Sequence, residues 1–326
     1  MAVLDKAMET TVGALDRRFL LTSFVPTAAF LGLLTVTLRP GAFGAWERES
    51  TGGQVAQGIV FLLAAALCAG LVSGTTVPLL RFLEGYWPGP LGAFGRRHHR
   101  AVLVRLGKEG PYQRIESGYP LPSDLAAVLP TTLGNVLRNA ERYPAYRYGL
   151  DAVVVWPRLY LVASDRALAG VASARSDVDL QATVCALSAL YGVIAGAEAL
   201  VTGRPWGMFL LVFTVPMAVA MVTYRAAVAA ARVYGVQLKA VFDLHRLELL
   251  EKVAPDLEGP EPDRWHSVQQ LWYRAIPLEA SVPEQDREPV AEETDPPWWV
   301  RVPLSGWFAL IVVTVSLLAA PMSLGR

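Results

Sequence analysis

The chain has 326 residues, of which 53% are hydrophobic and 18% charged, and its 29 basic and 29 acidic residues give a formal net charge of zero. Soluble proteins carry about 25% charged residues, so this composition argues against an ordinary soluble protein. The lack of net positive charge removes a general attraction for nucleic acid, and we expect no nucleic-acid partner.

Long uncharged runs predict an integral membrane protein. A helix rises about 1.5 Å per residue and the hydrocarbon core is about 30 Å thick, so about 20 apolar residues are needed to cross it. Five runs meet this requirement, at 19–38, 55–80, 180–200, 205–224 and 303–321. The predicted fold is therefore mainly α, a polytopic membrane protein with about five transmembrane helices. The first four form two hairpins, 19–80 and 180–224.

Two other interpretations of these runs were weighed. Buried core helices of a soluble protein are usually shorter and interrupted by charge, unlike these five runs. A secretory signal peptide would explain the first run, but that run is long for such a peptide and no A-x-A cleavage site precedes Arg39. Both interpretations are disfavoured.

The distribution of basic residues predicts the orientation. With a cytoplasmic N-terminus, the inner segments 1–18, 81–179 and 225–302 hold 25 of the 29 Lys and Arg residues, as expected for cytoplasmic loops. Trp298 and Trp299 suit an interfacial position beside the fifth run. We therefore expect a cytoplasmic N-terminus and an external C-terminus. Because Arg greatly outnumbers Lys, we also expect a bacterial source and the inner (plasma) membrane.

The first hairpin contains small residues that permit close helix contact. Ala64–Ala66, Gly70 and Gly74 lie in its second run, and small side chains let membrane helices approach each other. Cys68 and Cys185 also fall in apolar runs, where a thiol behaves as a small hydrophobic group. We expect no disulfide and no cysteine-based metal site.

A basic cluster follows the first hairpin, formed by Arg96, Arg97, His98, His99 and Arg100. One interpretation is that Arg96, Arg97 and Arg100 contact anionic lipid headgroups. The other is that the cluster only fixes the topology. A metal site is disfavoured because neighbouring histidines on a helix point in different directions.

The stretch 129–162 carries the most distinctive pattern. Thr131 or Thr132 is a suitable N-cap, and Pro144 is expected to end the helix that follows. The apolar face of that helix is predicted to consist of Leu133, Val136, Leu137, Ala140 and Tyr143. The apolar run 152–156 is predicted to be a strand or a buried turn.

This stretch resembles the pattern P-T-x-L-G-N-x-L-R, then Y-G-x-D, then W-P-R, of a family of multipass bacterial membrane proteins of uncharacterised function. The matching residues are Pro130, Thr131, Leu133, Gly134, Asn135, Leu137, Arg138, Tyr148, Gly149, Asp151, Trp156, Pro157 and Arg158. The resemblance covers about a tenth of the chain. It implies a membrane protein with a cytoplasmic module and implies no activity.

Polar and aromatic residues of this stretch form the candidate ligand- or partner-binding site. They are Asn135, Arg138, Arg147, Tyr148, Asp151, Trp156 and Arg158. The alternative is that they hold the module together, for example through an Arg–Asp pair.

The second cytoplasmic segment, 225–276, is predicted to be a helical extension of the fourth run. No proline interrupts Arg225–Val253, and this helix would pack on the first module or on a second copy of the chain. A shorter amphipathic stretch follows, with an interfacial or partner-binding face made of Trp265, Val268, Trp272 and Ile276. The region 277–302 is acidic and proline-rich and is predicted to be a flexible linker.

The sequence shows no recognised catalytic motif. It lacks a Walker loop, a dinucleotide-binding glycine pattern, H-E-x-x-H and G-x-S-x-G, and we expect no cofactor and no metal. Glu198 is the one acidic residue inside the runs, and it is expected at the outer end beside Arg204.

Three functions fit these observations. The first is an integral membrane anchor or scaffold whose cytoplasmic modules bind a protein partner or self-associate. The second is an oligomerising pore-forming or membrane-perturbing effector, and the third is a membrane-proximal enzyme or transporter subunit. The first is favoured, because two amphipathic faces lack an obvious partner in the sequence.

Overall fold

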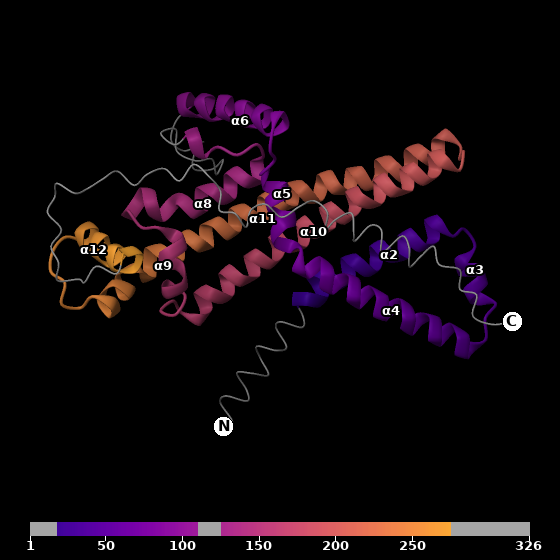
Figure 1. Cartoon of the computed structure of the whole chain (residues 1–326), viewed down its shortest axis with the longest axis horizontal. Helices are drawn as coiled ribbons and strands as arrows, with labels where there is room; N and C mark the ends of the chain where they lie inside the picture. The colour runs from indigo at the N-terminus through magenta and orange to yellow at the C-terminus, as the bar shows by residue number, and fades with distance from the viewer. Residues whose placement is uncertain (1–17, 110–124, 275–326) are drawn as a thin grey trace, which may run out of the picture. The chain divides into compact units, whose positions relative to one another are not determined.

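The computed structural model describes residues 18–109 and 125–274. Every regular element in these two ranges is helical, which confirms the mainly α fold (Figure 1). In chain order they are a π-helical turn (Leu20–Phe24), α2 (Val25–Leu38), α3 (Ala42–Glu47), α4 (Thr51–Gly74), α5 (Thr76–Glu84), α6 (Pro90–Glu109), a 3-10 turn (Leu125–Ala127), α8 (Thr132–Tyr148), α9 (Ala152–Leu159), α10 (Asp165–Val201), α11 (Trp206–Val253) and α12 (Glu261–Arg274). The predicted linker 277–302 and fifth run 303–321 lie outside the described residues.

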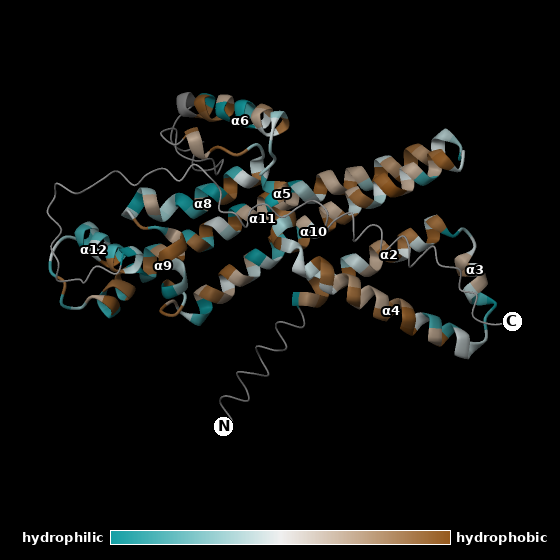
Figure 2. Ribbon diagram, viewed as in Figure 1, coloured by the Kyte–Doolittle hydropathy of each residue, from teal (hydrophilic) through white to brown (hydrophobic). Residues whose placement is uncertain are grey.

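Four helical stretches are long and apolar enough to cross a membrane. They are Leu20–Leu38, Thr51–Gly74, Asp165–Val201 and Trp206–Val253, whose apolar parts are coloured brown in Figure 2. They overlap the first four runs found in the sequence, in keeping with a polytopic membrane protein. Only 6% of the most apolar window of α11 is buried inside the protein, and so large an exposed apolar surface is typical of contact with lipid.

Ion pairs lie at both ends of the membrane-crossing part of α10. Buried Asp179 accepts a hydrogen bond from Arg18 at 2.8 Å. At the other end Glu198 accepts one from Arg204 at 2.7 Å, and Arg204 also donates to the Thr37 carbonyl oxygen at 3.2 Å. Asp179 and Glu198 are 19 residues apart. That is about 28 Å along a helix, which matches the hydrocarbon thickness of about 30 Å.

The long helices α10 and α11 pair closely inside this membrane-crossing part. A Cβ atom added to Gly192 would lie 3.0 Å from the Met217 side chain, and one added to Gly196 would lie 3.1 Å from Phe213. The two glycines are four residues apart on α10, so they form one small face against which α11 packs. This pair was not singled out in the sequence.

Both helices are much longer than one membrane crossing requires. They contain 37 and 48 residues, or about 55 Å and 72 Å at about 1.5 Å per residue. The predicted extension of the fourth run through 225–253 is confirmed, because α11 runs unbroken to Val253.

The second span ends earlier than the uncharged run that predicted it. The run 55–80 was expected to be one helix, but α4 ends at Gly74 and α5 begins at Thr76. Pro78 explains the break, because a proline cannot donate to the carbonyl four residues earlier, here that of Gly74, and its ring clashes with it.

The two predicted cytoplasmic segments pack together into one helical body, made of residues 76–84, 132–159, 165–179 and 225–274. One core cluster is centred on Phe242, Trp265 and Leu159, and a second on Leu133 and Val178. Of the two expected partners for the α11 extension, the structure therefore shows the module of the same chain. The approach is close, since a Cβ atom on Gly235 would lie 3.1 Å from the Ala140 Cβ atom.

The helix that begins after Thr131 is longer than expected. Its N-cap is confirmed, because the Thr131 hydroxyl accepts a hydrogen bond from Gly134 N–H at 3.1 Å. The expectation that Pro144 ends the helix is wrong. Pro144 is buried inside α8, which ends at Tyr148 and is capped by Gly149 with a φ of +67°. The buried face of α8 compensates for the missing hydrogen bond, and glycine supplies the left-handed cap.

The run 152–156 is neither a strand nor a turn but the first part of α9. The Asp151 carboxylate caps this helix by accepting a hydrogen bond from Val153 N–H at 2.8 Å. Aspartate is a favourable N-cap residue and so indicates the start of a helix. The valines that follow favour a strand, and this opposite preference led to the wrong prediction.

Candidate functional site

Asn135 holds the loop that leads into α8. Its side chain is fully buried, accepts a hydrogen bond from Leu129 N–H at 2.8 Å, and donates to the carbonyl oxygens of Leu129 at 2.8 Å and Thr131 at 2.7 Å. All these partners are backbone groups of the preceding loop. Asn135 therefore stabilises the loop before α8, and none of its side-chain polar atoms is directed at a ligand.

Arg138 belongs to a charged cluster between α5 and α8. It lies 3.8 Å from Glu141, and the cluster also contains Glu84. Burial, and secondarily the Glu141 charge, raise the pKa of Glu84 to about 7, although the positive charges of Arg175, Arg81 and Arg138 oppose this shift. No local pattern in the sequence distinguishes Glu84 from other acidic residues.

The remaining motif residues gather where α8 ends and α9 begins, beside α11 and α12. We call this region the α8–α9 corner, formed by Tyr143, Tyr148, Asp151, Trp156, Arg158, Asp243, Arg246, Gln269, Trp272 and Tyr273. The side chains come from segments that are far apart in the sequence. The corner is therefore the place where the two predicted cytoplasmic segments are joined.

Asp243 of α11 is the acceptor at the centre of the corner. The hydroxyl groups of Tyr148 and Tyr143 both donate to it, at 2.7 Å and 2.9 Å. The Arg246 guanidinium lies 4.0 Å from the centre of the Tyr148 ring, and the Lys239 ammonium lies 5.3 Å from that of Tyr143. Burial, followed by the hydrogen bond to Asp243, raises the pKa of Tyr143, while burial lowers the pKa of Lys239.

Asp151 is held by α12 in addition to capping α9. Its backbone N–H donates to Gln269 Oε1 at 2.9 Å, and Gln269 Nε2 donates to the Gly149 carbonyl oxygen at 3.0 Å. The Tyr273 hydroxyl donates to the Asp151 carboxylate. The turn between α8 and α9 is thus fastened to α12 by three hydrogen bonds.

Trp156 and Arg158 join α9 to the neighbouring helices. The Trp156 ring lies 5.9 Å from the Phe242 ring of α11. Arg158 donates to the Val154 carbonyl oxygen at 2.7 Å and stacks on Trp272 of α12, 4.1 Å from its ring centre. The sequence predicts that Trp272 lies on an interfacial or partner-binding face, but in the structure it belongs to this internal contact.

The expected Arg–Asp pair is not formed in the part of the chain that the structure describes. Arg147 is exposed, and neither Arg138 nor Arg158 is paired with Asp151. Tyr148, Asp151, Trp156 and Arg158 share the corner, whereas Asn135 and Arg138 lie elsewhere on α8. The seven residues therefore do not converge on one pocket.

The predicted amphipathic face of α12 is used within the chain. Trp265 and Val268 are fully buried in the core that contains Phe242, and Ile276 lies outside the described residues. The interpretation of Trp265 and Val268 as a partner-binding face is therefore wrong. Arg246 strengthens this docking through an ion pair with Glu261 at 2.8 Å.

The surface of α9 opposite the core is apolar and exposed. Val153 of α9 is 81% exposed, and Tyr160 and Leu161, in the turn directly after α9, are 52% and 84% exposed; Pro157 of α9 lies between them in the sequence and is also exposed. We call these four residues the α9 ridge. The polar atoms of the corner are bonded to one another, whereas the side chains of the neighbouring ridge are exposed, so the ridge is the surface more available for contact with another molecule.

The basic cluster lies on α6. Arg97 and Arg100 are exposed, Arg96 is half-buried, and His99 is buried. Burial, followed by the neighbouring His98, lowers the pKa of His99. No group of His, Cys, Asp and Glu side chains suited to a metal ion occurs among residues 18–109 and 125–274.

The fold and the corner define a class: a polytopic α-helical membrane protein whose last two described spans extend into a packed helical body. No family model, curated protein or solved structure matches the chain. The resemblance to the family with the P-T-x-L-G-N-x-L-R pattern stays a prediction.

Proposed function

We propose that the chain is an integral membrane anchor or scaffold that binds a protein partner through the α9 ridge. The observation that carries this proposal is the exposed apolar surface of Val153 on α9 and of Tyr160 and Leu161 in the turn after it, next to a helix that hydrogen bonds and ring contacts hold in place. Exposed apolar groups on a rigid support are typical of protein-binding sites. The polar groups of the corner are engaged with one another, which suits a support better than a reactive centre.

A site-specific photo-cross-linker tests this assignment. We expect a cross-linker at Leu161, in the full chain in its native membrane, to capture one discrete partner or a second copy. A cross-linker at Leu244, which is 73% exposed on α11, is the matched control and should capture neither. Val153→Glu should abolish capture from position 161. Equal capture from both positions, or capture that survives Val153→Glu, would contradict the proposal.

The proposed orientation places the helical body in the cytoplasm, with the N-terminus inside, the C-terminus outside and the chain in the bacterial plasma membrane. It rests on the distribution of Arg and Lys. A cysteine replacing Ala169, which is exposed on α10, should react with a membrane-impermeant maleimide only after the cells are opened. Labelling in intact cells would reverse the orientation.

An oligomerising pore-forming or membrane-perturbing effector is the second candidate. It is supported by exposed Ala66, Gly70 and Gly74 on one side of α4, where a Cβ atom added to either glycine would meet nothing within 4 Å. Such a surface accommodates a second helix. Ion leakage that appears on expression and is lost in Gly70→Leu would favour this candidate, whereas an intact membrane potential would argue against it.

The third candidate, a membrane-proximal enzyme or transporter subunit, has less support. Asp151, its proposed polar centre, caps α9 and accepts from Tyr273. Activity in this class would need a group free to react.

A further inference from the structure

Helix α6 combines basic and exposed apolar residues without any acidic residue over most of its length. From Pro90 to Leu106 it contains four arginines, Arg96, Arg97, Arg100 and Arg105, and neither Asp nor Glu. Leu91 is 73% exposed, Phe94 76% and Val104 49%. Apolar and basic residues on one side of a helix are typical of helices that lie in the interface of an anionic membrane.

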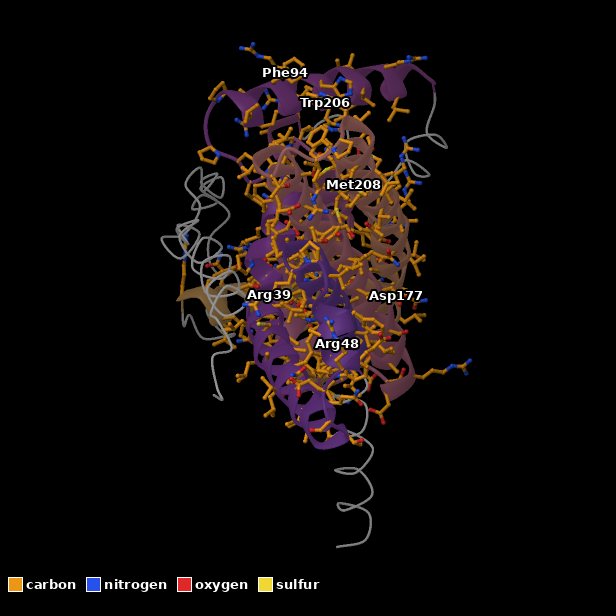
Figure 3. All side chains as sticks on the ribbon, turned by 90° about the vertical axis from the view of Figure 1, so that its right-hand side faces the viewer. Arg39, Arg48, Phe94, Asp177, Trp206 and Met208 are labelled. Carbon is orange, nitrogen blue, oxygen red and sulfur yellow. The ribbon has the colours of Figure 1, made fainter. Side chains whose placement is uncertain are left out.

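The opposite side of α6 is fixed to the rest of the chain. Leu103 and His99 are buried, and Arg100 Nε donates to the Leu125 carbonyl oxygen at 3.1 Å. A Cβ atom on Gly95 would lie 2.7 Å from the Pro130 carbonyl oxygen, so the helix and this loop are in direct contact. The outward face of α6 therefore consists of Leu91, Phe94, Arg97, Ala101, Val104 and Arg105. Figure 3 shows Phe94 pointing outward.

A short series of contacts places the first part of α6 near the membrane boundary. Pro130 contacts Gly95, and three residues further on the Leu133 N–H donates to the Tyr224 hydroxyl at 3.4 Å. Tyr224 is the last residue of the uncharged run 205–224, directly before Arg225. Leu80 of α5 belongs to the same core cluster as Val178 and Ala182, which flank Asp179. The segments on either side of α6 are thus packed at the level where α10 and α11 leave the hydrocarbon.

We propose that the outward face of α6 binds the headgroup region of an anionic bilayer, the same membrane that the chain crosses. Phe94 and Leu91 enter the boundary of the acyl chains, while Arg97 contacts lipid phosphates. This assignment differs from the set Arg96, Arg97 and Arg100 expected from the sequence, because Arg96 lies toward the packed side and Arg100 is bonded to Leu125. An acidic protein segment would match the arginines but would leave the large apolar side chains in water.

The test uses the full chain reconstituted in vesicles. A fluorophore is attached to a cysteine replacing Ala101, which is exposed on the outward face, so Phe94 and the arginines stay intact. The matched control is Ala169→Cys on α10, because Ala169 is also exposed. It lies 10 residues before Asp179, on the side away from the membrane-crossing part, or about 15 Å from it at about 1.5 Å per residue. The native Cys68 and Cys185 are buried, and unsubstituted chain measures any background labelling.

In vesicles containing about one third phosphatidylglycerol in phosphatidylcholine, we expect spin-labelled lipid to quench the probe at 101 at least about twofold more than the probe at 169. The difference should shrink in pure phosphatidylcholine and disappear in the Phe94→Glu/Arg97→Glu variant. Equal quenching at 101 and 169 would overturn the proposal. Shielding of position 101 from an aqueous quencher without lipid quenching would also overturn it, because the occupant would then be protein.

Discussion

Replacement of Asn135 with alanine should destabilise the helical body by about 3 kcal/mol. The side chain makes three hydrogen bonds to the backbone of Leu129 and Thr131, at 2.7–2.8 Å, and it is fully buried. Each buried hydrogen bond contributes about 1 kcal/mol net, and backbone groups left without a partner cost about 1–3 kcal/mol each. Denaturant unfolding of the purified chain in a mild detergent would measure this loss.

Asn139 provides the matched control on the same helix. It is half-buried, and no hydrogen bond from its side chain is found in the described part of the chain. Asn139→Ala should change the free energy of unfolding by no more than about 0.5 kcal/mol, and alanine favours a helix. If Asn135→Ala were as stable as Asn139→Ala but lost its protein partner, Asn135 would be a binding residue and the structural interpretation of the motif would be refuted.

Three further predictions, made with four substitutions, test other parts of the structure. Gly192→Leu should separate α10 from α11 and destabilise the chain by about 2 kcal/mol in thermal unfolding, whereas Gly74→Leu, which meets open space, should change stability by less than about 0.5 kcal/mol. The pKa of Glu84 is raised from its ordinary 4.5 to about 7, so the folded chain retains a proton that the unfolded chain releases, and stability falls as pH rises between these values. Between pH 4.5 and pH 7, the free energy of unfolding should fall by about 1 kcal/mol less in Glu84→Gln than in the unsubstituted chain. Arg18→Gln should lower the free energy of unfolding by about 1 kcal/mol, because buried Asp179 then keeps only its bond to Arg175. An unchanged free energy of unfolding would mean that the Arg18–Asp179 pair does not fix the membrane boundary.

The membrane-crossing helices could be predicted because hydropathy is a local property of the sequence. Lipid contact requires apolar residues over a whole helix, so the runs at 19–38 and 205–224 coincide with helices in the structure. Proline effects were predicted less well. Pro78 breaks a helix that hydropathy alone would continue, and Pro144 is tolerated in α8 because the buried face of that helix holds it in place.

The corner could not be predicted from the sequence because its contacts join distant segments. Tyr148 and Asp243 are 95 residues apart in the chain, and Asp151 and Tyr273 are 122 apart. No local spacing indicates such pairs. The pattern of Trp265 and Val268 was correctly seen as an apolar helix face, but a sequence cannot tell whether such a face packs inside its own chain or on another protein.

Distance from the bilayer distinguishes the two exposed apolar surfaces. The α9 ridge immediately precedes α10, whose first residue, Asp165, is 14 residues from Asp179. That separation is about 21 Å along the helix, beyond the headgroup layer, which is about 5–8 Å deep on each side. Lipid cannot cover Val153 and Leu161 at that distance, so their burial requires protein. Phe94 has a similar exposure, but it is attached through Gly95 and Pro130 to residues at the boundary itself, where lipid is the nearest apolar phase.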